Sequence, residues 1–272
     1  RNITTMQYSS LSRKIRMTDP DMCNSQNSAV CYWSYGYDLN GNLTSQTDAK
    51  SQVISFMIDA LNRVQKKCYG NNPCTVNTSP PYITYTYDAC EADTQYCRGK
   101  LASAASVPSA TSETTSFVYD QRQRTVKTKK NITGAPGIDY ITQYTYDSMD
   151  RTVSIGYPTG SVSTVYYTYD SAGNLYQVGE VGVTHATYEN HTALGQPGTV
   201  KYHDPLSPSA TTTYTYSAAN ARLARMVTVN QSQTTLQDLT YGYSTEGTIS
   251  GIPDGVYPYR NTQAFDYDFL HR

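Results

Sequence analysis

The sequence predicts an all-β protein that is built from repeated β-hairpins and contains essentially no helix. Three observations favour this class. Tyr dominates the aromatic residues, with 27 Tyr against 4 Phe and 1 Trp. Many of these Tyr residues alternate with one other residue, a spacing that places two rings on the same face of a strand. A turn-forming motif then follows the Tyr pair, and it recurs along nearly the whole chain.

The motif consists of a Tyr, an Asp and, three residues further on, a residue that tolerates a left-handed backbone. We count eleven copies, with a mean period of about 26 residues, which is typical of repeat architectures. The strongest copies are Tyr37-Asp38, Tyr87-Asp88, Tyr119-Asp120, Tyr146-Asp147, Tyr169-Asp170 and Tyr267-Asp268. The weaker copies are Tyr8-Ser9, Ile58-Asp59, Tyr188-Glu189, Tyr216-Ser217 and Tyr243-Ser244.

Each copy predicts a strand, a tight turn and a second strand. The Asp or Ser suits the first position of a type I turn, and Gly suits the fourth. The residues at the fourth position are Gly41, Gly173, Gly247, Asn62, Asn220 and Asp150. Expected strands lie before the turns at 35–37, 144–146, 167–169, 214–216 and 241–243, and resume after them at 43–44, 64, 152–153, 175–176 and 249.

The segments between copies predict turns at the opposite ends of the hairpins. In residues 43–59 we expect a strand, a turn over Thr47-Asp48-Ala49-Lys50 and another strand. A helix is the alternative, since the apolar residues at 54, 57, 58, 61 and 64 also fit helical spacing. We favour the strand, because residues 56–64 fall in register with residues 144–153 and supply a copy of the motif.

Two copies, YGYDLNGNLTSQTDA and YTYDSAGNL, closely resemble the YD (tyrosine–aspartate) repeats of the Rhs family. Their pattern is roughly Tyr-x-Tyr-Asp-x-x-Gly-Arg/Asn-Leu. Such repeats occur in bacterial Rhs polymorphic toxins, in the B and C subunits of insecticidal toxin complexes, in wall-associated bacterial proteins and in animal teneurins. The resemblance implies a continuous antiparallel ribbon of hairpins that spirals into a hollow shell. We therefore expect residues 1–272 to form one YD-repeat array that is part of a longer repeat protein.

Six cysteines form three close pairs within the first hundred residues: Cys23 with Cys31, Cys68 with Cys74, and Cys90 with Cys97. Each pair brackets a polar, turn-rich insertion, so we favour local disulfides that staple enlarged loops, although six cysteines permit 15 connectivities. Disulfides indicate an oxidising compartment, and so an extracellular or cell-surface protein. Free thiols and a zinc site are the alternatives; the spacings are longer than a zinc knuckle requires and no His lies nearby.

The sequence offers no catalytic constellation, and we predict a non-enzyme without cofactor or metal. The four histidines are His185, His191, His203 and His271, and no acidic partner follows His185 or His191 at catalytic or ligand spacing. The repeated Asp residues follow the period of the repeat, and their role in turns accounts for them. Rhs toxins commonly carry an aspartyl autoprotease with an Asp-Pro-rich signature. Here Asp19-Pro20 and Asp204-Pro205 lie in inter-repeat turns, so that activity is not carried over.

The net charge of -1 excludes a general attraction to nucleic acid, and no apolar run approaches the ~18 residues that span a bilayer. The short basic run at Lys127, Lys129 and Lys130 is typical of a solvated strand.

The main functional hypothesis is a shell segment that encloses or presents a toxin or another polypeptide. The alternative is an extracellular scaffold for adhesion, for glycan or surface-protein binding, or for filament formation. Flanking repeats of the same or another chain are expected partners, since strands at both ends would otherwise expose unpaired edges.

Overall fold

The computed structural model describes residues 3–23, 31–71, 73–90, 96–108, 111–134, 139–158, 164–203 and 209–268. The fold is all-β, as predicted: 19 strands belong to one antiparallel sheet and three to a second sheet. Within the described residues, helix is limited to a 3-10 turn, η1 (Pro20–Met22), and one α-helical turn, α1 (Pro258–Asn261). No helix among the described residues is long and apolar enough to cross a membrane.

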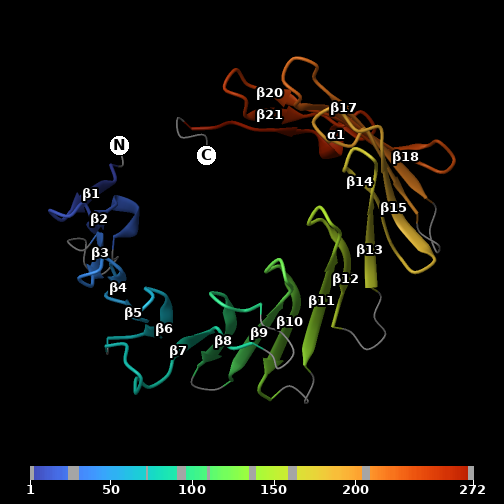
Figure 1. The fold of residues 1–272 in the computed structure, drawn as a ribbon. Coiled ribbons are helices and arrows are strands. Elements are labelled where there is room, and N and C mark those ends of the chain that lie inside the picture. Colours follow the sequence, from blue (N-terminus) through green and yellow to red (C-terminus); the bar gives the residue numbers. More distant parts are fainter. Residues whose placement is uncertain are drawn as a thin grey trace. The chain divides into compact units, whose positions relative to one another are not determined.

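The chain divides into two compact units, Arg1–Gln143 with Pro158–Gly160, and Tyr144–Tyr157 with Ser161–Arg272. In the first unit each strand pairs with the next one along the chain, and Figure 1 shows this order from blue to green. Its strands are β1 (Thr5–Tyr8), β2 (Lys14–Thr18), β3 (Tyr32–Tyr37), β4 (Leu43–Thr47), β5 (Val53–Ile58), β6 (Val64–Tyr69), β7 (Tyr82–Tyr87), β8 (Leu101–Val107), β9 (Glu113–Tyr119), β10 (Thr125–Ile132) and the start of β11 (Tyr140–Tyr146).

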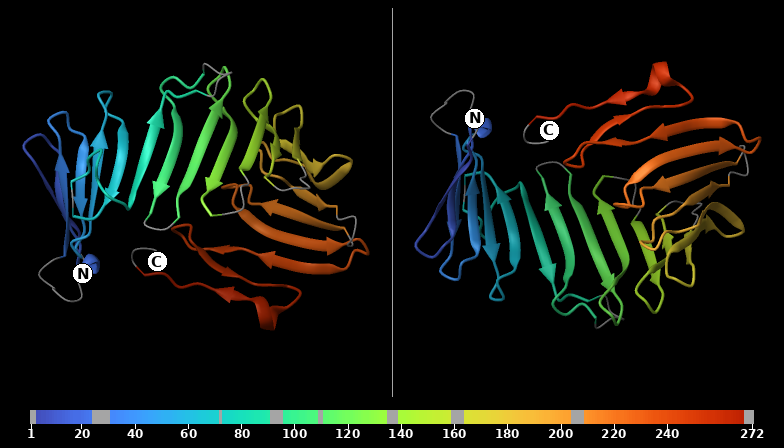
Figure 2. Two further views of the ribbon diagram at one scale, coloured as in Figure 1. Left: turned by 90° about the horizontal axis from the view of Figure 1, so that it is seen from below. Right: turned by 90° about the horizontal axis from the view of Figure 1, so that it is seen from above.

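The second unit continues the same pattern of neighbour pairing from β12 onward. Its strands are β12 (Thr152–Gly156), β13 (Thr164–Tyr169), β14 (Leu175–Glu180), β15 (Val183–Glu189), β16 (Thr199–Tyr202), β17 (Ala210–Tyr216), β18 (Leu223–Asn230), β19 (Thr235–Thr240), β20 (Gly242–Tyr243), β21 (Ile249–Ile252) and β22 (Gln263–Ala264). The last three form the small sheet. Within each unit the strands lie in a single layer (Figure 2).

A single layer leaves few positions for a densely packed core. Among the described residues, the buried apolar side chains are mostly small, and Val118, Tyr119 and Val200 are the largest of them. The strands instead carry half-buried side chains on both faces. Stability must therefore come largely from ladder hydrogen bonds and from side-chain pairs across neighbouring strands, each pair worth roughly 0.2–1 kcal/mol. This agrees with a sequence rich in Tyr and poor in other aromatic residues.

Residues 53–69 form the strands β5 and β6, so the helical alternative for this segment is excluded. Ile54 lies opposite Tyr69, and Ile58 lies opposite Val64. The preceding turn begins at Asp48, one residue later than predicted: the Ser51 N–H donates to the Asp48 carbonyl, and the Asp48 N–H donates to the Gln52 carbonyl.

The same turn recurs at the regular copies of the motif, together with a β-bulge at the motif Tyr. At Asp59 the residue three positions later donates to the Asp carbonyl, and the Asp N–H donates to the carbonyl four positions later. The register shifts immediately before the Tyr position, for instance between Thr168 and Tyr169. This geometry needs a left-handed residue at the fourth position. Gly41, Gly173, Gly247, Asn62 and Asp150 have positive φ there, as predicted.

Two of the predicted turn positions were wrong. After Tyr216 the turn is one residue longer, so the residue with positive φ is Ala221 rather than Asn220. The copy assigned to Tyr188-Glu189 is displaced, because Glu189 still belongs to β15 and lies opposite Thr199. The turn there runs from Thr192 to Gln196, with Gly195 in the left-handed position.

Candidate functional site

The Asp of each regular copy opens its turn, and its carboxylate accepts hydrogen bonds from backbone N–H groups of that turn. In Asp59, Oδ1 accepts hydrogen bonds from the N–H groups of Leu61 and Arg63, each 2.8 Å long. Asp120 and Asp147 make the same pair of bonds at 2.9 and 3.0 Å. The bond from the Arg63 N–H lowers the pKa of Asp59; partial burial opposes this, and the Arg63 guanidinium adds to it. The repeated carboxylates are thus ionised turn-forming groups.

The residue four positions after the Asp closes the turn with its side chain. Arg63, Arg124 and Arg151 each donate from Nε to Oδ2 of their own Asp over 2.7 Å. In two copies an Asn takes this place: Asn42 donates to Asp38 over 2.8 Å, and Asn174 donates to Asp170 over 3.1 Å. Arg and Asn therefore alternate in the motif because both can donate to the second carboxylate oxygen.

The Arg side chains also reach the next copy of the motif. The Arg63 guanidinium lies 4.4 Å from the centre of the Tyr87 ring, and its Nη1 is 2.8 Å from Oδ2 of Asp88. The same stacking joins Arg151 to Tyr169 at 4.3 Å. Longer contacts join Arg13 to Tyr37 and Arg222 to Tyr243. We call this set of contacts, together with the Tyr hydroxyl bond described next, the repeat joint.

The hydroxyl of the motif Tyr fastens each copy to the copy before it. In six of the seven described cases the hydroxyl donates to the backbone carbonyl of the first residue of the return strand of the preceding hairpin, and Tyr216 donates to Pro197, two residues before β16. The bonds are 2.7–3.1 Å long and run from Tyr37 to Lys14, Tyr87 to Val64, Tyr119 to Leu101, Tyr169 to Thr152, Tyr216 to Pro197, Tyr243 to Leu223, and Tyr267 to Ile249. The preference for Tyr over Phe follows, since Phe cannot make this bond.

The motif residues not yet described also lie at the ends of strands or in the turns that follow them. Tyr146 ends β11 and is followed by Asp147, while Asp268 follows Tyr267 near the end of the described chain. Asp88 is an enlarged copy: its N–H donates to the Lys100 carbonyl, and its Oδ1 accepts from the Gly99 N–H. An insertion that contains Cys90 and Cys97 therefore lies inside this turn.

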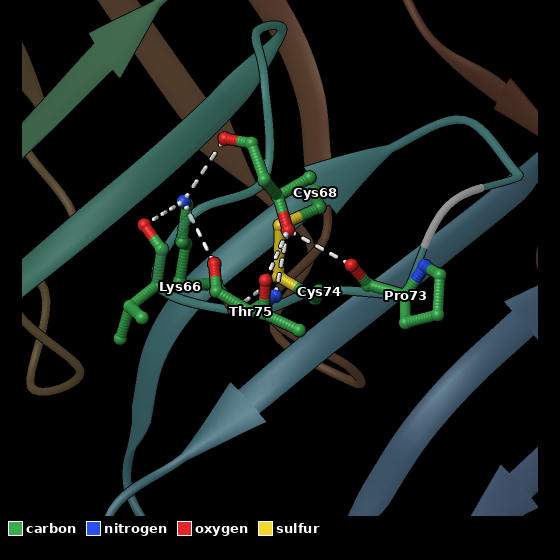
Figure 3. Close-up of a disulfide and its surroundings, with 7 residues drawn as sticks. Lys66, Cys68, Pro73, Cys74 and Thr75 are labelled. Carbon is green, nitrogen blue, oxygen red and sulfur yellow. Dashed lines mark hydrogen bonds between the residues drawn. A yellow bond between two sulfur atoms is a disulfide. The ribbon is translucent and has the colours of Figure 1, made fainter.

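The six cysteines form three disulfides, Cys23–Cys31, Cys68–Cys74 and Cys90–Cys97, which is the local pairing that we favoured. The second of them holds the connection between β6 and β7, residues 70–81, together with a buried lysine (Figure 3). Lys66 is only 4% exposed, and its ammonium donates to the carbonyls of Thr75, Val76 and Thr78 over 2.9–3.3 Å. Sequence reasoning missed Lys66, since nothing in its neighbourhood sets it apart from other strand lysines.

Among the described histidines, His203 lies directly after β16 and beside His185 of β15, and its N–H donates to the His185 carbonyl over 2.8 Å; His271 lies outside the described residues. His185 lies 3.3 Å from Glu180, His191 lies 3.7 Å from Asp170, and the His203 ring is 3.1 Å from the Thr187 hydroxyl. The acidic neighbours of His185 and His191 precede them in the chain, where sequence reasoning did not look for them. Within the described residues, no group of three or more His, Cys, Asp or Glu side chains could hold a metal ion.

These contacts define a class of protein: an array of antiparallel β-hairpins in which a Tyr-Asp motif forms each turn and joins it to the next. No protein-family model matches the sequence, and no curated protein matches it. Solved structures do match over the whole chain. The crystal structure of TcdB2-TccC3 without its hypervariable C-terminal region covers 99% of this chain with a TM-score of 0.65 and 18% identity.

The Photorhabdus luminescens Tc holotoxin pore covers 100% of the chain with a TM-score of 0.66 and 16% identity. The crystal structure of TcdB2-TccC3-Cdc42 also covers 100% of the chain, with a TM-score of 0.66 and 17% identity. This chain spans 15% of the length of each of these three matching chains. The comparison confirms the Rhs/YD-type fold that the motif predicted.

Proposed function

We propose that this chain is a non-catalytic segment in the wall of a YD-repeat shell, within a secreted or surface-delivered protein that encloses a toxin or another polypeptide. One observation carries the proposal: solved Tc toxin structures resemble this chain, with TM-scores of 0.65 and 0.66. The likeness extends over 99–100% of this chain, so it rests on the array as a whole and not on a single hairpin.

The repeat joint supplies the mechanical property that such a wall needs. A wall of one layer cannot depend on a thick core, so each hairpin must be held by its neighbour. A Tyr hydroxyl bond and an Arg stacked on that Tyr hold Tyr87 to the preceding hairpin. Because each joint is local, stability adds along the array as it does in solenoids, and the wall can be long without a growing core.

The chemistry of the described residues supports a scaffold over an enzyme. The carboxylates that repeat along the chain, such as Asp59 and Asp147, are occupied by turn N–H groups and by their own Arg. Three disulfides support an oxidising destination, and therefore secretion or surface display. The partners we propose are flanking repeats and an enclosed polypeptide.

Protease protection tests the enclosure. The native protein is isolated from its source and digested with trypsin, and mass spectrometry follows which peptides appear. We expect a protected segment outside the array that is cut only after reductant and mild urea open the wall. A native protein in which every segment outside the array is cut at the same rate before and after opening would overturn enclosure. It would leave an open surface scaffold as the better description.

A further inference from the structure

A cavity of about 710 Å³ lies on one face of the first unit, beside the turn between β4 and β5. Its size is within the range of roughly 300–1,000 Å³ that is typical of ligand sites. Strand register explains which side chains meet there. Gln46 lies opposite Ile54, and Ile54 lies opposite Tyr69, so the three share one face of the sheet. Trp33 reaches the same face from β3, because Tyr35 lies opposite Gln46.

Two aromatic rings contribute the apolar part of the lining. Trp33 is the single Trp of the chain, and Tyr69 is 38% exposed although it lies within a strand. The Lys67 ammonium lies 5.0 Å from the centre of the Tyr69 ring, a contact that steadies the ring. Pro81 adds a further apolar surface to the lining.

The polar part of the lining is mainly neutral. Gln46, Gln52 and Asn71 bring amides, which both donate and accept hydrogen bonds. Among the described residues of the lining, Asp48 is the one that carries a charge, and its Oδ1 already accepts from the N–H groups of Lys50 and Gln52. The nearest cation noted above, the Lys67 ammonium, already contacts the Tyr69 ring. A ligand without polar groups would bury the amides without partners, at a cost of about 1–3 kcal/mol for each group.

The walls of the cavity are fixed before any ligand arrives. The Tyr69 N–H donates to the Pro81 carbonyl over 3.2 Å, and the Gly70 N–H donates to the Val53 carbonyl over 2.9 Å. The rest of this connection is fastened on the opposite face, to Cys68 and Lys66 (Figure 3). A stapled connection whose two ends line a cavity is preorganised, which lowers the entropy cost of binding.

We propose that this cavity binds a neutral oligosaccharide. A pyranose ring presents C–H groups on its flat faces and hydroxyls around its edge. The faces match the rings of Trp33 and Tyr69, and the hydroxyls match the amides of Gln46, Gln52 and Asn71. The site is independent of what the array encloses, so it stands or falls separately from the shell function.

Trp33 reports on its own cavity, since no other Trp contributes to the fluorescence. The full chain is titrated with cellotetraose, a flat β-linked glucose oligomer, and with chitotetraose. At least one of them should give a saturable change in emission. Tyr69→Ala should weaken that binding at least about tenfold, and Gln52→Ala, in an exposed turn, should weaken it about threefold. Tyr166→Ala, at a strand Tyr with a similar exposure of 41%, serves as the matched control and should bind like the unmodified chain.

Three results would overturn the proposal: no saturable change with either sugar, binding that survives both Tyr69→Ala and Gln52→Ala, or binding that Tyr166→Ala weakens equally. A Phe-rich neutral peptide is titrated in parallel. Tighter Tyr69-dependent binding of that peptide than of both sugars would identify a peptide groove instead. Circular dichroism shows whether each variant is folded. If Tyr69→Ala does not fold, the result for Gln52→Ala decides the test.

Discussion

The connection between β4 and β5 and the connection between β6 and β7 both join successive hairpins of the first unit, but they are held in different ways. The first is a short turn in which Asp48 binds the N–H groups of Lys50 and Gln52, and Ser51 takes the left-handed position. The second, residues 70–81, depends on a disulfide and on the buried ammonium of Lys66. The conformation of a short turn is determined by its own residues, whereas a longer connection is stabilised by bonds to residues of the neighbouring strand.

The largest expected effect comes from removing the buried ammonium. Lys66→Met leaves the carbonyls of Thr75, Val76 and Thr78 without their shared donor, and the free energy of unfolding should fall by about 2–3 kcal/mol. Urea denaturation of the full chain measures it. Lys67→Met, at the next position on the other face of β6, removes only the contact with the Tyr69 ring and should cost about 0.5 kcal/mol. Equal losses in the two variants would contradict the role of Lys66.

Removing the disulfide should have the next largest effect. Cys68→Ala combined with Cys74→Ala should lower the free energy of unfolding by about 2 kcal/mol, since the bond closes a short loop. Hydrogen exchange, followed by mass spectrometry, should show faster exchange in residues 73–81 while the turn at Asp48 is unchanged. Faster exchange spread evenly over the whole first unit would show that the bond does not act locally.

The short turn should lose less. Asp48→Ala removes an acceptor from two N–H groups and should cost about 1 kcal/mol in urea denaturation. Asp48→Asn keeps an oxygen at the same place and should retain most of this stability. If Asn were as damaging as Ala, the carboxylate would act by its charge and not as the acceptor of the turn.

A comparable loss is expected at the repeat joint. Tyr119→Phe removes the hydroxyl bond of 2.8 Å to the Leu101 carbonyl and should cost about 1 kcal/mol. Tyr166→Phe, at a ring that is 41% exposed, should cost less than about 0.5 kcal/mol by the same measurement. The account of the joint fails if the two Tyr variants lose the same amount.

The smallest effect at neutral pH concerns Tyr214 in the second unit. Burial, followed by a hydrogen bond with Tyr202, raises the pKa of Tyr214 to about 12. The folded state therefore holds this proton more tightly than the unfolded state, whose Tyr titrates near 10. Its stabilising contribution is complete below pH 10 and is lost as the pH rises through 12. Absorbance at 295 nm should show a late phenol titration that Tyr214→Phe removes; a chain whose tyrosines all titrate near 10 would disagree.

The fold could be predicted from sequence because its turns are local. An Asp that binds nearby N–H groups, followed by a residue that tolerates positive φ, is readable within a few positions, as at Asp38 and Gly41. Prediction failed where the hairpin forces a positive φ on residue types that do not favour it, or where another residue type replaces the Asp. Ala221 and Gln123 have positive φ although neither type favours it, and Thr192 takes the place of an Asp without a preceding Tyr.

The contacts of the repeat joint could not be predicted from the sequence as well as the turns could. The pattern includes Arg or Asn four positions after the Asp, but a pattern does not say that Arg63 reaches Tyr87, a residue of the next copy. Likewise, Lys66 is buried against the carbonyl of Thr75 and the ring of Tyr82, and contacts with residues so much later in the chain leave no local signal.

Cryo-electron microscopy of the native protein, isolated with whatever segments accompany this chain, tests the central claim most directly. The account predicts a closed hollow particle whose wall is one hairpin thick, with the hydroxyls of Tyr87 and Tyr169 on the carbonyls of Val64 and Thr152. Continuous fibres, or stacked sheets without a cavity, would contradict it.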